Sequence, residues 1–111
     1  MSLRFEDLEP GVPLGIVLED GRAVCLLRVG DHVYALADQC SHQAMPLSAG
    51  YAVSPNETGN APEIECAWHG ARFRCATGEP TRRPALDAVP TYEVSIENGR
   101  VIVGPRKKAV G

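Results

Sequence analysis

Two short segments of the chain each place a cysteine close to a histidine. Cys40 is followed by His42, and Cys66 by His69, so the spacings are Cys-x-His and Cys-x-x-His. Two thiolates combined with two imidazoles form the ligand set of a two-iron, two-sulfide cluster with mixed ligation. These four residues are therefore the candidate metal ligands, and one such cluster per chain is the favoured interpretation.

The ligand set also predicts what the metal centre would do. Replacing two thiolates by two neutral imidazoles removes two negative charges from the centre. Adding an electron to a neutral centre meets less Coulomb repulsion than adding it to a dianion, so the reduction potential rises. The ligands therefore favour a tuned one-electron carrier, and no substrate-converting chemistry is needed to explain them.

A structural zinc site is the alternative, because cysteine and histidine pairs also bind tetrahedral zinc. Zinc motifs usually group like ligands, with a cysteine pair followed by a histidine pair. Here each segment mixes the two ligand types. The mixture favours iron and sulfide, and a zinc-stabilised interaction domain remains the rival interpretation.

The segments that must position the ligands are rich in β-forming residues. Polar–apolar alternation and β-branched runs predict strands over residues 12–18, 22–29, 32–36, 64–66, 72–75, 90–96 and 100–103. Asp-Gly, Gly-Asp and Asn-Gly pairs between several of these runs are hairpin signals. Residues 4–8 are predicted as either one helical turn or an edge segment. The fold class is therefore all-β.

The ligand segments resemble a known family. Residues 40–50 (CSHQAMPLSAG) and 66–73 (CAWHGARF) are similar to the two cluster-binding loops of Rieske proteins, and residues 76–80 (ATGEP) are similar to the third loop of that family. The resemblance extends over roughly residues 12 to 104. It implies the Rieske fold, which is an antiparallel β base with an inserted cluster-binding subdomain.

The resemblance also implies the cofactor and its ligands. By analogy with Rieske proteins, one [2Fe-2S] cluster would be bound, with Cys40 and Cys66 on the inner iron. His42 and His69 would bind the outer iron and leave one ring nitrogen each near the surface. Electrons would then enter and leave through these imidazole edges.

Four neighbours of the ligands indicate the subtype. Rieske domains of respiratory cytochrome complexes carry a disulfide between the positions that are Met45 and Trp68 here, so this chain cannot form that bond. The same relatives have serine and tyrosine hydroxyls where this chain has Ala71 and Phe73. Hydroxyl donors stabilise the reduced cluster, so their loss lowers the potential. We expect a potential toward the bottom of the roughly −150 to +300 mV Rieske range, as in the ferredoxin type.

Length and charge are consistent with a small carrier. The chain has 111 residues and a formal net charge of −3, from 14 acidic and 11 basic residues. We expect one domain over residues 1–111, with the base formed by 1–38 and 88–111 and the cluster-binding subdomain by 39–87. The acidic surplus argues against nucleic acid or an anionic membrane as partner. Without an apolar span or a signal peptide, we expect a cytoplasmic protein. We also expect a monomer.

The resemblance implies two partners. In bacterial systems that hydroxylate aromatic rings, a ferredoxin of this type takes electrons from an NAD(P)H-dependent flavin reductase and passes them to a terminal oxygenase. Two related functions remain open, namely the small subunit of an assimilatory nitrite reductase and a Rieske module of another oxidoreductase. Fold alone does not separate these functions.

The remaining residues with chemical potential are interpreted as structural. Cys25 and Cys75 are predicted to be buried thiols that pack in the core and form no disulfide in a reducing cytosol. His32 begins a strand and is predicted to be an ordinary, partly exposed side chain. Residues 54–62 are predicted to form a surface loop between the ligand segments, and the basic residues 106–108 to be disordered.

Overall fold

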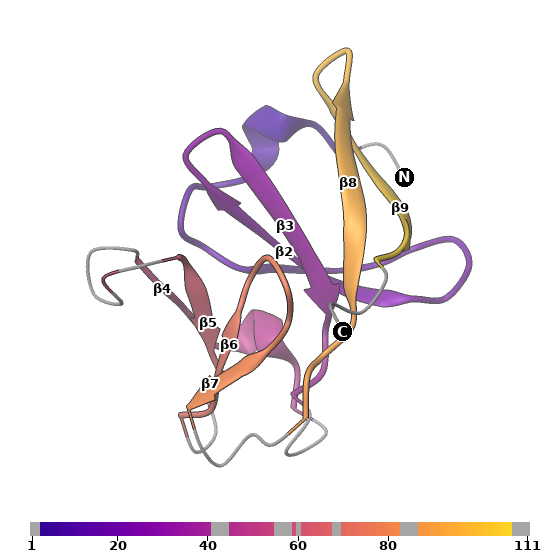
Figure 1. Ribbon diagram of the computed structural model, residues 1–111. Helices are drawn as coiled ribbons and strands as arrows, with labels where there is room; N and C mark the ends of the chain where they lie inside the picture. Colours follow the sequence, from indigo (N-terminus) through magenta and orange to yellow (C-terminus); the bar gives the residue numbers. More distant parts are fainter. Residues whose placement is uncertain are drawn as a thin grey trace.

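The computed structural model describes residues 3–40, 45–54, 59, 61–67, 70–82 and 87–107, and Figure 1 shows how they are arranged. In this part of the chain the only helices are two single 3-10 turns, and the rest of the regular structure is β. The elements are η1 (Phe5–Asp7), β1 (Leu14–Val17), β2 (Ala23–Val29), β3 (His32–Ala37), η2 (Leu47–Ala49), β4 (Tyr51–Val53), β5 (Glu63–Glu65), β6 (Arg72–Arg74), β7 (Pro80–Arg82), β8 (Thr91–Glu97) and β9 (Arg100–Arg106).

The strands form two antiparallel sheets. The larger sheet has the order β1-β2-β3-β8-β9, and the smaller has the order β4-β5-β6-β7. Figure 1 shows the smaller sheet beside one end of the larger one. All four strands of the smaller sheet lie in sequence between β3 and β8, which are neighbours in the larger sheet. The predicted all-β architecture is therefore confirmed, with one sheet inserted between two neighbouring strands of the other.

Two-residue turns set the register of the larger sheet. Val29 lies opposite His32 across the Gly30-Asp31 pair. At the other hairpin, Asn98 and Gly99 join β8 to β9 with φ angles of 52° and 77°. Positive φ at both central residues is what a type I′ turn requires, and Asn-Gly is the favoured pair for it. The hairpins predicted from these dipeptides are thus present.

Strand β2 is buried on both faces and divides the core in two. Cys25 and Leu27 join a cluster of buried side chains that reaches into the smaller sheet. Val24 and Leu26 alternate with them and pack in a second cluster on the opposite face. Because successive side chains of a strand point to opposite faces, one strand supplies both clusters. The first cluster is the one that joins the two sheets and positions the ligand segments.

Some local predictions needed correction. Strands β4 and β7 and the turn η2 were not predicted from the sequence. The N-terminal segment satisfies both expectations, since η1 is a helical turn and Arg4 forms an isolated bridge with Arg100. The basic tail was expected to be disordered from residue 106, but β9 includes Arg106, and the Lys107 amide donates to the Thr91 carbonyl at 2.8 Å.

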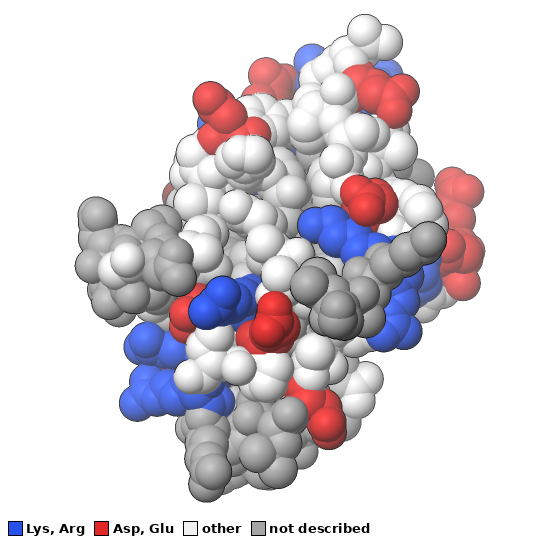
Figure 2. Space-filling model, in the orientation of Figure 1, with Lys and Arg blue, Asp and Glu red and all other residues white. Residues whose placement is uncertain are grey.

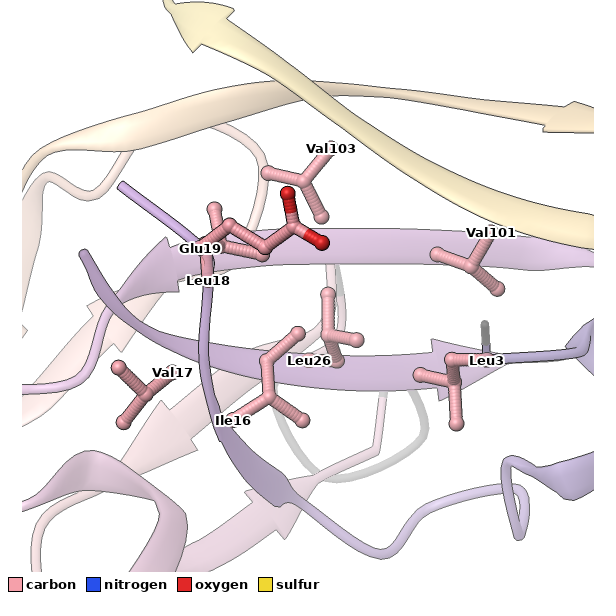
Figure 3. A pocket seen from close by; sticks show the side chains of 8 residues that line it. All are labelled: Leu3, Ile16, Val17, Leu18, Glu19, Leu26, Val101 and Val103. Carbon is pink, nitrogen blue, oxygen red and sulfur yellow. The ribbon is translucent and has the colours of Figure 1, made fainter. Parts of the chain in front are cut away.

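An apolar hollow of about 120 Å³ opens on the larger sheet (Figure 3). Its lining includes Leu26, so it lies on the face of β2 that points away from the ligand segments. The lining residues are Leu3, Ile16, Val17, Leu18, Glu19, Leu26, Val101 and Val103. None is a predicted ligand, and the hollow therefore belongs to the base. In the described part of the chain, no helix has the length and apolar character needed to cross a bilayer.

Candidate metal centre

The structure brings the two candidate cysteine ligands into one buried cluster. Cys40 is 2 % exposed and Cys66 is 3 % exposed, and both belong to the core that joins the two sheets. They come from different places: Cys40 lies just after β3 of the larger sheet, and Cys66 just after β5 of the smaller one. His42 and His69 lie outside the described residues. The arrangement thus unites two candidate sulfur ligands that are 26 positions apart in sequence.

Each ligand loop is closed by one backbone hydrogen bond from its cysteine. The Cys40 amide donates to the Met45 carbonyl at 2.8 Å, and the Cys66 amide donates to the Ala71 carbonyl at 2.7 Å. Both bonds join a ligand cysteine to the residue five positions later, although the Cys–His spacings differ. In sequence, each candidate histidine falls between the two ends of one of these closures. The two loops are therefore closed by separate hydrogen-bonded backbone rings of the same size.

A second closure surrounds the first ligand loop. One carboxylate oxygen of Asp38 accepts from the Ser48 amide at 2.7 Å, and the other accepts from the Ser48 hydroxyl at 2.7 Å. This pair, which we call the Asp38–Ser48 clamp, packs against Gly15 in β1. A Cβ atom on Gly15 would lie 2.8 Å from Asp38 Oδ2 and 2.6 Å from Ser48 Oγ. Only glycine leaves room for the clamp there, so β1 supports the ligand loop directly.

The two ligand loops are fixed to one another at Gly50. This glycine follows η2, and its Cα approaches the Glu65 carbonyl so closely that a Cβ atom would overlap the oxygen. Glu65 immediately precedes Cys66, and Tyr51 lies opposite Glu65 in the β4–β5 ladder. The end of the first ligand loop is therefore packed on the strand that begins the second.

A third segment closes over the same core. The Gly78 amide donates to the Arg74 carbonyl at 2.8 Å, and the Val89 amide donates to the Gly78 carbonyl at 3.0 Å. Gly78 has a φ angle of 76°, which favours glycine. Val89 belongs to the buried cluster that contains Cys40 and Cys66. The residues resembling the third Rieske loop thus pack beside the two ligand loops.

Cys25 and Cys75 pack beneath the ligand loops, as expected from the sequence. Both are buried in the same cluster as the ligand cysteines. Burial raises the pKa of Cys75 to about 12, with a smaller contribution from the Glu63 carboxylate. Burial, followed by the charges of Asp38 and Cys75, also raises the pKa of Cys25. The structure describes all four cysteines of the chain, and none forms a disulfide.

The surroundings of the candidate cysteine ligands are apolar. Ala71 and Phe73 are completely buried in the hydrophobic core that holds Cys40 and Cys66, and neither side chain has a hydrogen-bond donor. Met45, at the position of a disulfide cysteine in high-potential relatives, packs against the same cluster. Two buried sulfur donors in an apolar core, each followed in sequence by a histidine, fit the ligand chemistry of a [2Fe-2S] centre.

The third histidine is not part of the site. His32 is exposed at the start of β3, and its ring stacks on Tyr34 with centroids 6.1 Å apart. It was predicted to be an ordinary side chain, and the structure confirms this. Sequence reasoning did miss the Asp38–Ser48 clamp. The one available signal was Gly15, because a glycine inside a strand often marks a close backbone or side-chain approach.

Comparison with known proteins gives the family. The family model described as Rieske [2Fe-2S] domain matches residues 2–93. Among curated proteins, ferredoxin CarAc of Metapseudomonas resinovorans is 32 % identical over 92 % of this chain and 89 % of its own length. The ferredoxin component of the naphthalene 1,2-dioxygenase system of Pseudomonas putida is 32 % identical over 92 % of this chain and 90 % of its own length.

Solved structures give the same result. The ferredoxin of carbazole 1,9a-dioxygenase from Nocardioides aromaticivorans IC177 has a TM-score of 0.81 and 33 % identity, covering 95 % of this chain and 98 % of that one. A complex of reduced oxygenase and oxidized ferredoxin in carbazole 1,9a-dioxygenase matches with a TM-score of 0.82 and 30 % identity, over 96 % and 93 % of the chains.

A putative NADH-dependent nitrite reductase small subunit from Mycobacterium tuberculosis has a TM-score of 0.81 over 99 % of this chain and 96 % of that one. Its identity is 24 %, so this likeness shows the fold alone. The match of the family model to most of the chain, and the relatives of similar length, agree with the buried cysteines. This chain belongs to the family of Rieske [2Fe-2S] domains, and its cofactor is one [2Fe-2S] cluster.

Proposed function

We propose that the chain is a one-electron carrier, the ferredoxin component of a multi-component system that hydroxylates aromatic rings. In this proposal Cys40 and Cys66 bind one iron, and His42 and His69 bind the other. The observation that carries it is the pair of buried cysteines on equally closed loops in one core. The ferredoxin components among its relatives share about nine-tenths of their length with it.

When bound, a [2Fe-2S] cluster supplies reversible one-electron chemistry. The residues of this chain set how easily the electron is accepted. Ala71 and Phe73 offer no hydroxyl to cluster sulfur, and both are buried beside Cys40 and Cys66. A reduced state without these donors is less stabilised, so the potential falls toward the low end of the Rieske range.

The proposed donor is an NAD(P)H-dependent flavin reductase, and the proposed acceptor is a terminal Rieske oxygenase. A solved complex of a similar ferredoxin with its oxygenase supports the second assignment by analogy. We further propose that the protein acts as a cytoplasmic monomer. Residues 39–87 would form its cluster-binding subdomain, and residues 1–38 and 88–111 its base. The order of strands in the two sheets supports this division.

Spectroscopy and voltammetry of the purified protein test the proposal. We expect a red-brown protein that gives a Rieske-type EPR signal after reduction, and a potential in the lower part of the family range. Replacing one proposed histidine ligand, His42→Cys or His69→Cys, should restore a negative charge and lower the potential. A colourless protein loaded with zinc would overturn the assignment, and so would a His→Cys potential equal to that of the wild type.

Reconstitution tests the place in the electron-transfer chain. With a flavin reductase and a two-domain Rieske oxygenase of a ring-hydroxylating system, the protein should support NAD(P)H-dependent oxidation of the substrate. Omitting the protein should abolish that oxidation. If the reductase reduces the oxygenase equally fast without the protein, the carrier role is wrong, whatever the spectrum shows.

A further inference from the structure

Two acidic side chains flank the proposed cysteine ligands. Asp38 lies two positions before Cys40, and Glu65 immediately precedes Cys66. A negative charge near a [2Fe-2S] cluster opposes its reduction, because the added electron lowers the charge of the cluster by one unit. The size of this effect depends on how far water and nearby cations screen the carboxylate. The structure gives the two acids very different surroundings.

Glu65 lies between cations on the outer face of the smaller sheet. Ile64 points into the core, so its neighbour Glu65 points outward, because side chains alternate in a strand. Glu65 Oε1 accepts from Arg72 Nε at 2.7 Å and lies 3.5 Å from Arg82 Nη1. Figure 2 shows acidic and basic side chains next to one another over this sheet. The negative charge of Glu65 is therefore offset at short range.

Asp38 meets uncharged donors instead. Its two carboxylate oxygens accept from the Ser48 amide and the Ser48 hydroxyl, each at 2.7 Å. In the described part of the chain, no lysine or arginine forms an ion pair with it. The Asp38–Ser48 clamp therefore fixes the position of this negative charge and does not neutralise it.

The carboxylate is enclosed between β1 and the first ligand loop. Asp38 is half-buried, and a Cβ atom on Gly15 would lie 2.8 Å from its Oδ2 atom, so the backbone of β1 covers one side of it. Gly15 lies opposite Cys25, which is completely buried in the core that contains Cys40 and Cys66. The charge of Asp38 thus lies beside the core that holds both proposed sulfur ligands.

The Cys25 thiol shows that this charge acts within the core. Burial raises the pKa of Cys25, and the charge of Asp38 raises it further. A raised thiol pKa means that the surroundings disfavour an added negative charge. A reduced cluster bound by Cys40 would add negative charge to the same core. The two effects therefore have the same sign.

We propose that Asp38 is a potential-setting residue, whose fixed carboxylate lowers the reduction potential of the bound cluster. The inference rests on the proposed function and deepens it. The effect is separate from the support that the clamp gives to the ligand loop, and it adds to the absence of hydroxyl donors at Ala71 and Phe73. A lower potential makes the reduced cluster a stronger electron donor to the proposed oxygenase.

Asp38→Asn separates the charge from the structure of the clamp. The asparagine oxygen can accept from the Ser48 amide while its nitrogen donates to the Ser48 hydroxyl oxygen, so both contacts are retained. A charge on the order of 10 Å from the iron, at an effective dielectric constant of about 20, changes the reduction equilibrium about ten-fold. We expect the potential of Asp38→Asn in voltammetry to rise by this factor, which is about 59 mV for one electron. An unchanged potential would overturn the proposal.

Two variants are matched controls. Asp31→Asn makes the same change of charge at the opposite end of β3, about 20 Å from Asp38 at a rise of about 3.3 Å per residue. Ser48→Ala removes the hydroxyl of the clamp and keeps the carboxylate. Both should change the reduction equilibrium by less than about two-fold. An equal rise in Asp31→Asn would assign the effect to net charge, and an equal rise in Ser48→Ala would assign it to loop geometry. Either result would contradict the proposal.

Salt distinguishes an enclosed charge from an exposed one. The Debye length falls from about 10 Å at 0.1 M salt to about 3 Å at 1 M, and partly buried charges are screened much less than exposed ones. The difference in potential between the wild type and Asp38→Asn should therefore keep more than half of its size at 1 M salt. Disappearance of the difference would show that the charge acts through bulk water, contrary to the proposal.

A second neutral variant guards against a failure of assembly. If Asp38→Asn binds no cluster, Asp38→Ser removes the same charge with a smaller side chain and should show the same rise in potential. Loss of the cluster from both variants would mean that the carboxylate is needed for assembly rather than for the potential, and would overturn the inference. A wild-type protein without a Rieske-type EPR signal would instead refute the proposed function, so the two failures are distinct.

Discussion

Removal of the Asp38 carboxylate should destabilise the first ligand loop strongly. In Asp38→Ala, the Ser48 amide and the Ser48 hydroxyl both lose their acceptor, each at 2.7 Å. A hydrogen bond to a charged group contributes about 1.5–3 kcal/mol, so the two together contribute at least about 3 kcal/mol. For 111 residues, an unfolding entropy of about 2.1 cal/mol/K per residue converts this loss to a fall in Tm of about 13 °C.

The assay is thermal unfolding of the cluster-loaded protein at one scan rate, followed by circular dichroism. Ser48→Ala removes the hydroxyl donor and keeps the amide, so its Tm should fall about half as far. Asp31→Ala, at the exposed β2–β3 turn, is the matched control and should change stability by less than about 0.5 kcal/mol. Asp38→Ala should also speed the loss of the cluster to an iron chelator, because Cys40 lies inside the clamp.

The double variant decides whether the clamp acts as a unit. Asp38→Ala combined with Ser48→Ala should be little less stable than Asp38→Ala alone, because the hydroxyl has already lost its acceptor. If the two losses add fully, the hydroxyl stabilises the protein through some other contact. A fall in Tm below about 4 °C for Asp38→Ala would refute the reasoning.

Three further outcomes follow from the site. Gly50→Ala should lower the free energy of unfolding in urea by about 1–3 kcal/mol, because the added Cβ would overlap the Glu65 carbonyl oxygen. Gly104→Ala is the control, since its Cβ would meet only ordinary contacts. Equal destabilisation by the two variants would contradict this prediction. Because Cys75 has a raised pKa in the folded state, its stabilising contribution is complete below pH 9 and is lost as pH rises toward 12. Cys75→Ala should therefore lose about 2 kcal/mol less than the wild type between pH 8.5 and 10.5 in the same assay, and parallel pH profiles would show that the thiol does not titrate as described. Phe73→Tyr should raise the reduction potential measured by voltammetry, because the added tyrosine hydroxyl can donate to the reduced cluster. The rise should be about 60 mV for each 1.4 kcal/mol by which the reduced state is stabilised. An unchanged potential would mean that the tyrosine hydroxyl does not reach the cluster.

Local sequence signals were sufficient for the parts of the molecule that depend on local chemistry. The Asn98-Gly99 turn, the buried strand around Cys25 and the two ligand cysteines were predicted because each follows from residue types at short spacing. The family resemblance implied that Cys40 and Cys66 bind one inner iron, and the structure shows both cysteines buried in one core.

Contacts between distant segments were not predictable in this way. Strands β4 and β7 were not predicted, and they form because they pair with β5 and β6 in the folded protein. The Asp38–Ser48 clamp and the packing of Gly50 on Glu65 depend on how two loops meet. Apart from Gly15, whose place inside a strand can mark a close approach, the single glycines and acids involved do not indicate where two loops meet until the strands are placed.

The adjacency of β3 and β8 has a consequence for how this protein can change. Leu36 lies opposite Thr91, and the Ala37 amide donates to the Pro90 carbonyl at 2.8 Å. The chain therefore leaves the larger sheet at the end of β3 and returns to it at the adjacent start of β8. In polymer terms, everything between is a single closed loop, and each doubling of a loop's length costs only about 0.6 kcal/mol of closure entropy. Lengthening a surface loop between β3 and β8 therefore costs the larger sheet little, provided that the core shared by the two sheets is kept. The paired ends of β3 and β8 are the place at which a longer or shorter metal-binding unit could be joined to the same base.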